Sequence, residues 1–130
     1  MKRLGLMWLI GLIGLIGCTK EVTPGELASL AAKGYYEELR QGRYDAFVEG
    51  IDGVAETPED YRQQLRKAAE QYVKELEQQH QGISSIEVTS AKADSSLQSM
   101  NVFMVLCFGD STREEICVPM VERSGAYLMR

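Results

Sequence analysis

The residue with the clearest chemistry in this chain is Cys18, because of the segment that precedes it. Residues 1–17 open with a basic Lys2-Arg3 pair, continue as an apolar run broken only by glycines, and end in Gly17. A basic start, a short apolar stretch and a final small residue are typical of a secretory signal. As a helix the apolar run would be roughly 21 Å long, too short for a ~30 Å hydrocarbon core. The sequence therefore predicts a signal segment that ends at a thiol.

The four residues Leu15-Ile16-Gly17-Cys18 resemble the lipobox of bacterial lipoproteins. The resemblance implies cleavage between Gly17 and Cys18, acylation of the Cys18 sulfur through a thioether, and acylation of the new amino group. Each buried methylene contributes about 0.8 kcal/mol, so several acyl chains hold a protein on a bilayer almost permanently. The alternative is an ordinary cleaved signal followed by a coincidental cysteine. We therefore expect a signal peptide over residues 1–17 and a lipidated tether over residues 18–24.

The residues after Cys18 bear on where the protein would be displayed. Thr19 and Lys20 follow it, so the aspartate that retains some lipoproteins in the inner membrane is absent. By this resemblance we expect a lipid-anchored protein of the cell envelope, on the outer membrane of a Gram-negative bacterium. Display toward the periplasm and display toward the outside both stay open. The expected partners are the bilayer, through acylated Cys18, and a small ligand or an envelope protein that no motif identifies.

The charge of the chain narrows the function classes. The net charge is -5, and loss of Lys2 and Arg3 with the signal would leave -7 on the mature side chains. Nucleic acids and anionic lipid surfaces attract clustered Lys and Arg, so an acidic body argues against nucleic acid binding and against electrostatic docking on lipid. The length left after cleavage suits one domain with a single core, which we expect over residues 25–130.

Two helix starts are written in nearly the same way, as Thr23-Pro24-Gly25-Glu26 and Thr57-Pro58-Glu59-Asp60. Both place Thr at a helix N-cap and Pro at the first helical position. The first helix should stop at Gly42, a short second helix should end near Gly53, and a third should follow Thr57. Helical spacing predicts buried stripes on the first and third helices. These are Leu27, Leu30, Ala31, Tyr35 and Leu39, and then Tyr61, Leu65, Ala68, Ala69, Tyr72 and Leu76.

The periodicity changes from helical to alternating after Gln81-Gly82. Strands are predicted from Ile83, over residues 100–108, over residues 113–122 and over residues 126–129, separated by polar turns. Helices followed by consecutive strands indicate an α+β fold, with three helices packed on one face of a curved four-stranded antiparallel meander. Because Pro119 cannot donate to a strand ladder, we expect a bulge or an unpaired position there.

Three further segments carry a family resemblance. They are residues 36–46, with the sequence YEELRQGRYDA, the strand Val102 to Phe108 with Gly109-Asp110, and residues 122–127, with the sequence ERSGAY. In this order they resemble small Bacteroidetes-like lipoproteins of the cystatin-like, nuclear-transport-factor-two-like superfamily, many of them domains of unknown function. The resemblance covers residues 25–130. It implies a half-open cone whose curled sheet grips the helices and can leave a pocket between them.

The resemblance also raises the question of catalysis, since related folds include isomerases and dehydratases that use a desolvated carboxylate and a tyrosine. Here the central strand carries no acid, and Glu114 and Glu115 adjoin a turn where they can reach water. His80 is expected at a helix C-terminus, where a cation is favoured. We therefore expect a non-enzymatic ligand- or protein-binding module, with an isomerase- or dehydratase-like enzyme as the alternative. The expected pocket lining is Tyr35, Tyr61, Tyr72, Phe103 and Tyr127.

The remaining cysteines, Cys107 and Cys117, lack the spacing of a zinc site, and the chain has one histidine, so no metal or cofactor is expected. An oxidising compartment would allow a disulfide between them. The predicted turn pairs Phe108 with Arg113, which places Cys107 opposite Glu114 and Cys117 opposite Met104. That register puts the two thiols on opposite faces of the sheet, so no disulfide is expected.

Overall fold

Three α-helices precede a four-stranded antiparallel sheet in the computed structural model, which describes residues 21–130. The helical part comprises α3 (Pro24–Arg40), α4 (Tyr44–Glu49), the 3-10 helix η1 (Val54–Glu56) and α5 (Glu59–His80). The strands are β2 (Ile83–Asp94), β3 (Ser99–Phe108), β4 (Arg113–Arg123) and β5 (Ala126–Met129), in the spatial order β2-β3-β4-β5. The predicted α+β fold is confirmed, whereas the predicted signal and Cys18 lie outside the described residues.

Helix α3 begins and ends where the sequence predicts. The N–H of Thr23 donates to Glu26 Oε1 at 2.9 Å, and the N–H of Glu26 donates to Thr23 Oγ1 at 3.1 Å. These two bonds form a capping box in front of Pro24. The helix stops before Gly42, whose φ of 83° is a left-handed conformation that glycine adopts at low cost.

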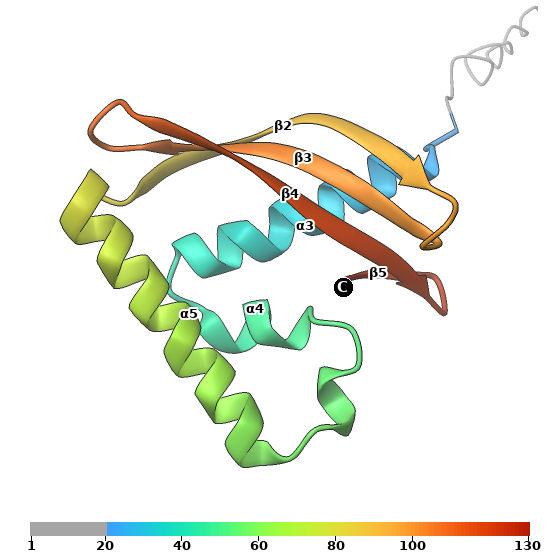
Figure 1. The fold of residues 1–130 in the computed structure, drawn as a ribbon, viewed down its shortest axis with the longest axis horizontal. Helices are drawn as coiled ribbons and strands as arrows, with labels where there is room; N and C mark the ends of the chain where they lie inside the picture. The colour runs from blue at the N-terminus through green and yellow to red at the C-terminus, as the bar shows by residue number, and fades with distance from the viewer. Residues whose placement is uncertain (1–20) are drawn as a thin grey trace, which may run out of the picture.

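Helix α3 lies along one face of the sheet (Figure 1), but the side chains that it buries differ from the prediction. Ala28, Ala32 and Leu39 are buried, whereas Leu27 is 45% exposed and Leu30 is 68% exposed. Small side chains let the helix backbone approach the sheet closely, as the position of a Cβ at Gly25, only 3.5 Å from the Ala91 Cβ, also indicates. Close packing therefore selects the alanine stripe, and two leucines predicted for the core are left on the surface.

Helix α5 also differs from the prediction at its start and on its buried face. The Thr57 hydroxyl donates to the Val54 carbonyl at 2.6 Å, so it closes η1, and Pro58 takes the N-cap position of α5 without a side-chain cap. Only Ala69, Val73 and Leu76 are buried along α5. Ala69 and Val73 pack beside Leu39 of α3, whereas Leu76 joins the core that lies on the sheet. Most of the predicted α5 stripe is therefore not core.

The core lies between α3 and the concave face of the sheet. Its centre is made by alternate residues of β3 and β4, namely Val102, Met104, Leu106, Val118 and Met120. Alternation sends the intervening residues of each strand to the outer face. Tyr36 and Phe47 join α3 to α4 in an edge-to-face ring contact, with centroids 5.3 Å apart.

The register of β3 and β4 corrects the prediction for the cysteines. The Phe108 N–H donates to the Thr112 carbonyl at 2.9 Å, and Ser111 has a φ of 75°, so the loop is one residue shorter than expected. Cys107 therefore pairs with Arg113, and Cys117 pairs with Phe103. Both thiols lie on the outer face, but four residues apart along the strand, or about 13 Å at ~3.3 Å per residue. Both are free in this structure, because that separation exceeds disulfide reach.

The irregularities of the sheet lie in β2 rather than at Pro119. Pro119 pairs with Asn101 without a bulge, and its carbonyl accepts from the Arg130 N–H at 2.8 Å, so its missing donor faces the β5 side. Register shifts occur instead around Ser84 and Thr89. The hydroxyls of these two residues donate to β3 carbonyls, at 2.9 Å and 3.1 Å. The Ser/Thr content of β2 thus satisfies backbone groups that the bulges would leave unpaired.

Candidate functional site

The interior of the fold is apolar. Among the described residues Ser99 is the one buried polar residue, and its hydroxyl has no partner. An isomerase or dehydratase of the kind found on related folds requires a desolvated carboxylate beside a tyrosine hydroxyl. Every aspartate and glutamate of residues 21–130 is half-buried or exposed. Within residues 21–130 the interior therefore offers no buried carboxylate.

Two of the five predicted pocket residues, Tyr35 and Tyr127, are in contact. The Tyr35 hydroxyl donates to the backbone carbonyl of Tyr127 at 2.8 Å, which ties α3 to β5. Burial raises the pKa of Tyr35 above its ordinary value. The Tyr35 ring lies so close to the Gly50 backbone that a Cβ there would be 2.4 Å from Tyr35 Cε1. The phenol is therefore held in place by packing and a backbone acceptor, and its role is architectural.

The other three predicted pocket residues lie elsewhere. Tyr61 is 47% exposed and Tyr72 is 36% exposed, both on α5, because that helix buries a different stripe. Phe103 alternates with Val102 and Met104 of the core, so it lies on the outer face of the sheet. The prediction of one pocket lined by all five residues is wrong.

A phenol that the sequence analysis missed is Tyr36. Burial, together with the smaller effects of the Tyr72 and Glu114 charges, raises the pKa of Tyr36 to about 12. Burial and Glu114 also raise the pKa of Tyr72. Glu114 pairs with Leu106, so it lies on the concave side of the sheet, yet it is exposed. This cluster holds neutral phenols beside a solvated acid. The one sequence signal for the position of Tyr36 is that it directly follows Tyr35. Because neighbouring residues of a helix point in different directions, two adjacent tyrosines contact different parts of the fold.

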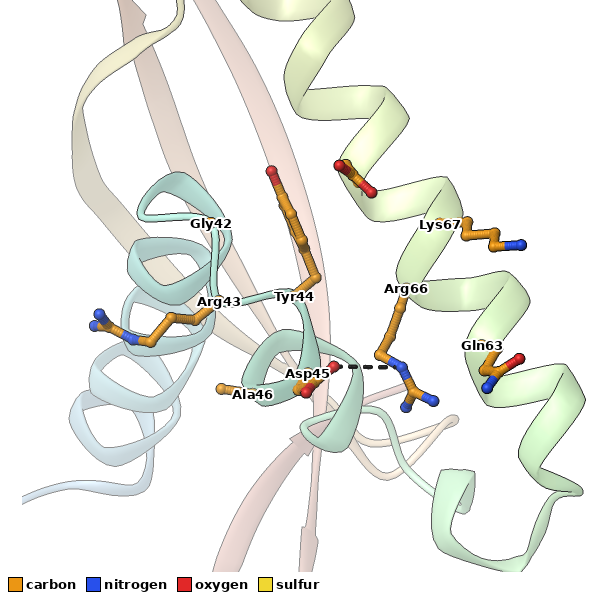
Figure 2. Close-up of a pocket in the computed structure, with 9 residues that line it drawn as sticks. Gly42, Arg43, Tyr44, Asp45, Ala46, Gln63, Arg66 and Lys67 are labelled. Carbon is orange, nitrogen blue, oxygen red and sulfur yellow. Dashed lines mark ion pairs between the residues drawn. The ribbon is translucent and has the colours of Figure 1, made fainter.

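A cleft of about 500 Å³ separates α4 from α5. Figure 2 shows Arg66 extending from α5 toward Asp45 of α4, and their charged atoms are 3.3 Å apart. Arg43 points to the opposite side of α4, and Lys67 points outward from α5 (Figure 2). The charged groups of this cleft therefore do not converge on one point where a ligand could bind. The ion pair joins two helices.

His80 has a structural position at the end of α5. Its ring stacks on Phe108 with centroids 4.9 Å apart, and its Nδ1 lies 2.9 Å from Asp110 Oδ2. Hydrogen bonds from Thr112, and the one with His80, hold the pKa of the Asp110 carboxyl at about 2. These contacts attach the end of α5 to the β3–β4 turn. No group of three potential metal ligands occurs in the part of the chain that the structure describes.

A second, larger hollow lies between α3 and the edge strand β2. We call it the α3–β2 groove. It has a volume of about 710 Å³, and its apolar walls come from the segment before α3, the outer side of α3, and β2 at its bulge. The sequence analysis missed it, because it assigned Leu30 to the core. The groove is lined by Glu21, Val22, Thr23, Gly25, Glu26, Ser29, Leu30, Lys33, Val88, Ser90 and Ala91.

Most of the exposed aliphatic residues gather around this groove. Val22, Leu30 and Val88 line it, and Leu27 lies one helical turn from Leu30 on α3. Scattered single hydrophobics on a surface need no explanation, but contiguous ones mark binding surfaces. The α3–β2 groove is therefore the best candidate for a binding site.

Over residues 21–130, no helix is both long enough and apolar enough to cross a bilayer.

Comparison with known proteins gives a fold. No protein-family model matches the sequence, and no curated protein matches it. Among solved structures, a "Putative NTF2-like transpeptidase" from Campylobacter jejuni superposes with a TM-score of 0.61 at 12% sequence identity. The match covers 75% of this chain and 92% of that one. At this identity the likeness concerns architecture, and the activity in that name belongs to the other protein. Three helices followed by a four-stranded meander are thus the nuclear-transport-factor-two-like α+β cone fold.

Proposed function

We propose that this protein is a lipoprotein of the cell envelope, held by acylated Cys18 on the outer membrane of a Gram-negative bacterium. Its folded domain acts as a non-enzymatic binding module, and the α3–β2 groove is its binding surface for an apolar ligand or partner. The anchor rests on Leu15-Ile16-Gly17-Cys18. The observation that carries the binding role is the exposure of Leu27 and Leu30 beside an apolar groove of about 710 Å³.

The energetics favour covering this surface. Burial of apolar area stabilises a complex by about 25 cal/mol per Å², and a fully covered leucine contributes about 2 kcal/mol. Leu30 is among the most exposed hydrophobic residues described, so most of that free energy is still to be gained. Ala28 and Ala32 already fill the sheet-facing side of α3, so the leucines are not needed to hold the helix on the sheet. Their exposure is consistent with a binding role.

The enzyme alternative has weaker support. An isomerase or dehydratase would need a desolvated acid in the cone, and Glu114, the acid whose charge raises the pKa values of Tyr36 and Tyr72, is exposed. A transpeptidase that forms an acyl-enzyme needs an activated nucleophile. Cys107 and Cys117 lie on the outer face of the sheet, and within residues 21–130 no hydrogen bond joins either thiol to His80. These positions favour binding.

Site-specific photocrosslinking in the native envelope tests the groove. A photoreactive phenylalanine derivative replaces Leu30 in one strain, and in the control strain it replaces Gln71, an exposed residue of α5. Both positions are solvent-facing, so neither change should disturb the core. We expect covalent adducts from position 30 severalfold more abundant than from position 71. Equal yields at the two positions would contradict the assignment of the groove as the binding surface.

A further inference from the structure

We infer that the apolar partner of the α3–β2 groove is the bilayer that carries the lipid anchor, so that this end of the domain rests on the membrane. The inference depends on the acylation of Cys18 proposed above. It adds an orientation: α3 and the bulge of β2 lie against the lipid, and α5 points away from it.

The length of chain before α3 places the groove close to the anchor. Six residue steps separate Cys18 from Pro24, the first residue of α3. A fully extended chain spans at most about 3.6 Å per residue, so the start of α3 lies within roughly 22 Å of the acylated residue. Glu21 and Val22, the first residues that the structure describes, already line the groove. The groove therefore begins where the chain arrives from the anchor.

The distribution of exposed hydrophobic side chains agrees with this placement. Figure 1 shows the start of α3 and the β2–β3 turn at one end of the molecule, and α5 toward the other. The exposed hydrophobics of the first end are aliphatic, whereas those of α5 are the tyrosines Tyr61 and Tyr72. Aliphatic side chains with no polar group suit contact with acyl chains. The first end carries Val22, Leu27, Leu30, Val88 and, in the β2–β3 turn, Leu97.

The charge near the groove permits contact with lipid. The groove lining contains two acids, Glu21 and Glu26, and one base, Lys33, so its formal charge is -1. The mature side chains as a whole would carry -7 once Lys2 and Arg3 are removed with the signal. An acidic body is repelled by anionic headgroups, so it would turn its less charged, apolar end toward the membrane. Charge and apolar surface thus favour the same orientation.

An extended protein segment added to the edge of β2 fits the observations less well. β2 is an edge strand of the sheet, but it carries bulges around Ser84 and Thr89 and an exposed Lys92. Bulges and lysines on edge strands are features that prevent pairing with a further strand. The second bulge lies at the groove itself, between Val88 and Ser90. The bilayer needs no backbone pairing, so the bulges are no obstacle to it.

Depth-dependent fluorescence quenching tests the orientation in the full-length, processed lipoprotein. The chain has one tryptophan, Trp8, in the predicted signal, so the processed protein has no background emission of this kind. Leu30→Trp is compared with Gln71→Trp, and Val88→Trp provides a second groove position. Each variant is reconstituted into phosphatidylcholine vesicles with either ordinary or brominated acyl chains, and vesicle flotation is measured in parallel.

We expect brominated lipid to quench Leu30→Trp and Val88→Trp severalfold more than Gln71→Trp. Equal quenching at the three positions in protein that floats with the vesicles would overturn the orientation and leave the anchor standing. Protein that does not float would overturn the anchor and the orientation with it. A third outcome is that the emission of Leu30→Trp changes with the amount of protein per vesicle and not with bromine. The groove then binds a second copy of the chain, and the inference is wrong.

Discussion

Replacing Cys18 with serine is expected to prevent acylation and to release the protein from the membrane fraction. Serine has no thiol to form the thioether, and the prediction rests on Leu15-Ile16-Gly17-Cys18 alone. At about 0.8 kcal/mol per buried methylene, loss of two or more chains abolishes stable anchoring. The measurement is the share of protein that resists an alkaline wash of purified membranes. We expect most of the wild-type protein and little of the C18S variant in the washed membranes.

The control for this experiment is Cys117→Ser, which removes a thiol exposed on the outer face of the sheet. It should leave the membrane share unchanged, since Cys117 lies in the folded domain. The N-terminal residue of each fraction is also determined, because an uncleaved leader could hold the serine variant on the membrane. A cleaved serine variant that still resists the wash as the wild type does would rule out lipid anchoring through Cys18.

Gly50→Ala is expected to destabilise the domain by about 2 kcal/mol, a typical value for overpacking in a core. Gly50 has a φ of -80° and a ψ of 0°, which alanine adopts readily, so the backbone contributes no strain. The added Cβ would instead lie 2.4 Å from Cε1 of the Tyr35 ring. The ring must move, and its hydrogen bond to the Tyr127 carbonyl is then lost. The free energy of unfolding in urea measures the effect.

Gly34→Ala is the matched control, because the same methyl group is added to an exposed helical glycine with no atom within 4 Å of its Cβ position. Alanine in a helix interior is favoured over glycine by about 1 kcal/mol, so this variant should be more stable than the wild type. Opposite signs for the two variants are the expected result. If Gly50→Ala were as stable as Gly34→Ala, the architectural role assigned to Tyr35 would be wrong.

The order of elements could be predicted from the sequence because its signals are local. Thr23 and Glu26 form the predicted capping box, and Gly42 follows the end of α3, since each acts through neighbouring backbone groups. The switch from helical to alternating spacing after Gln81-Gly82 likewise fixes where α5 ends and β2 begins. These features gave the α+β architecture without knowledge of packing.

The candidate site could not be predicted, because it depends on how the elements pack. Leu27 and Leu30, like Ala28 and Ala32, recur at helical spacing, so both stripes fit a buried face. Hydrophobicity favours the leucines, whereas the short distance between α3 and the sheet favours the alanines. The bulges of β2 and the three-residue turn before Thr112 each shift the strand register by one residue, and no local sequence signal marks these shifts. One residue of register was enough to place Cys107 and Cys117 on the same face.

The most direct test of the account is the intact mass of the wild-type protein extracted from envelope membranes. We expect a chain that begins at Cys18 and carries a diacylglyceryl thioether and an acylated amino group, without residues 1–17. A chain that retains Met1, or one that begins at Cys18 with an unmodified thiol, would contradict it.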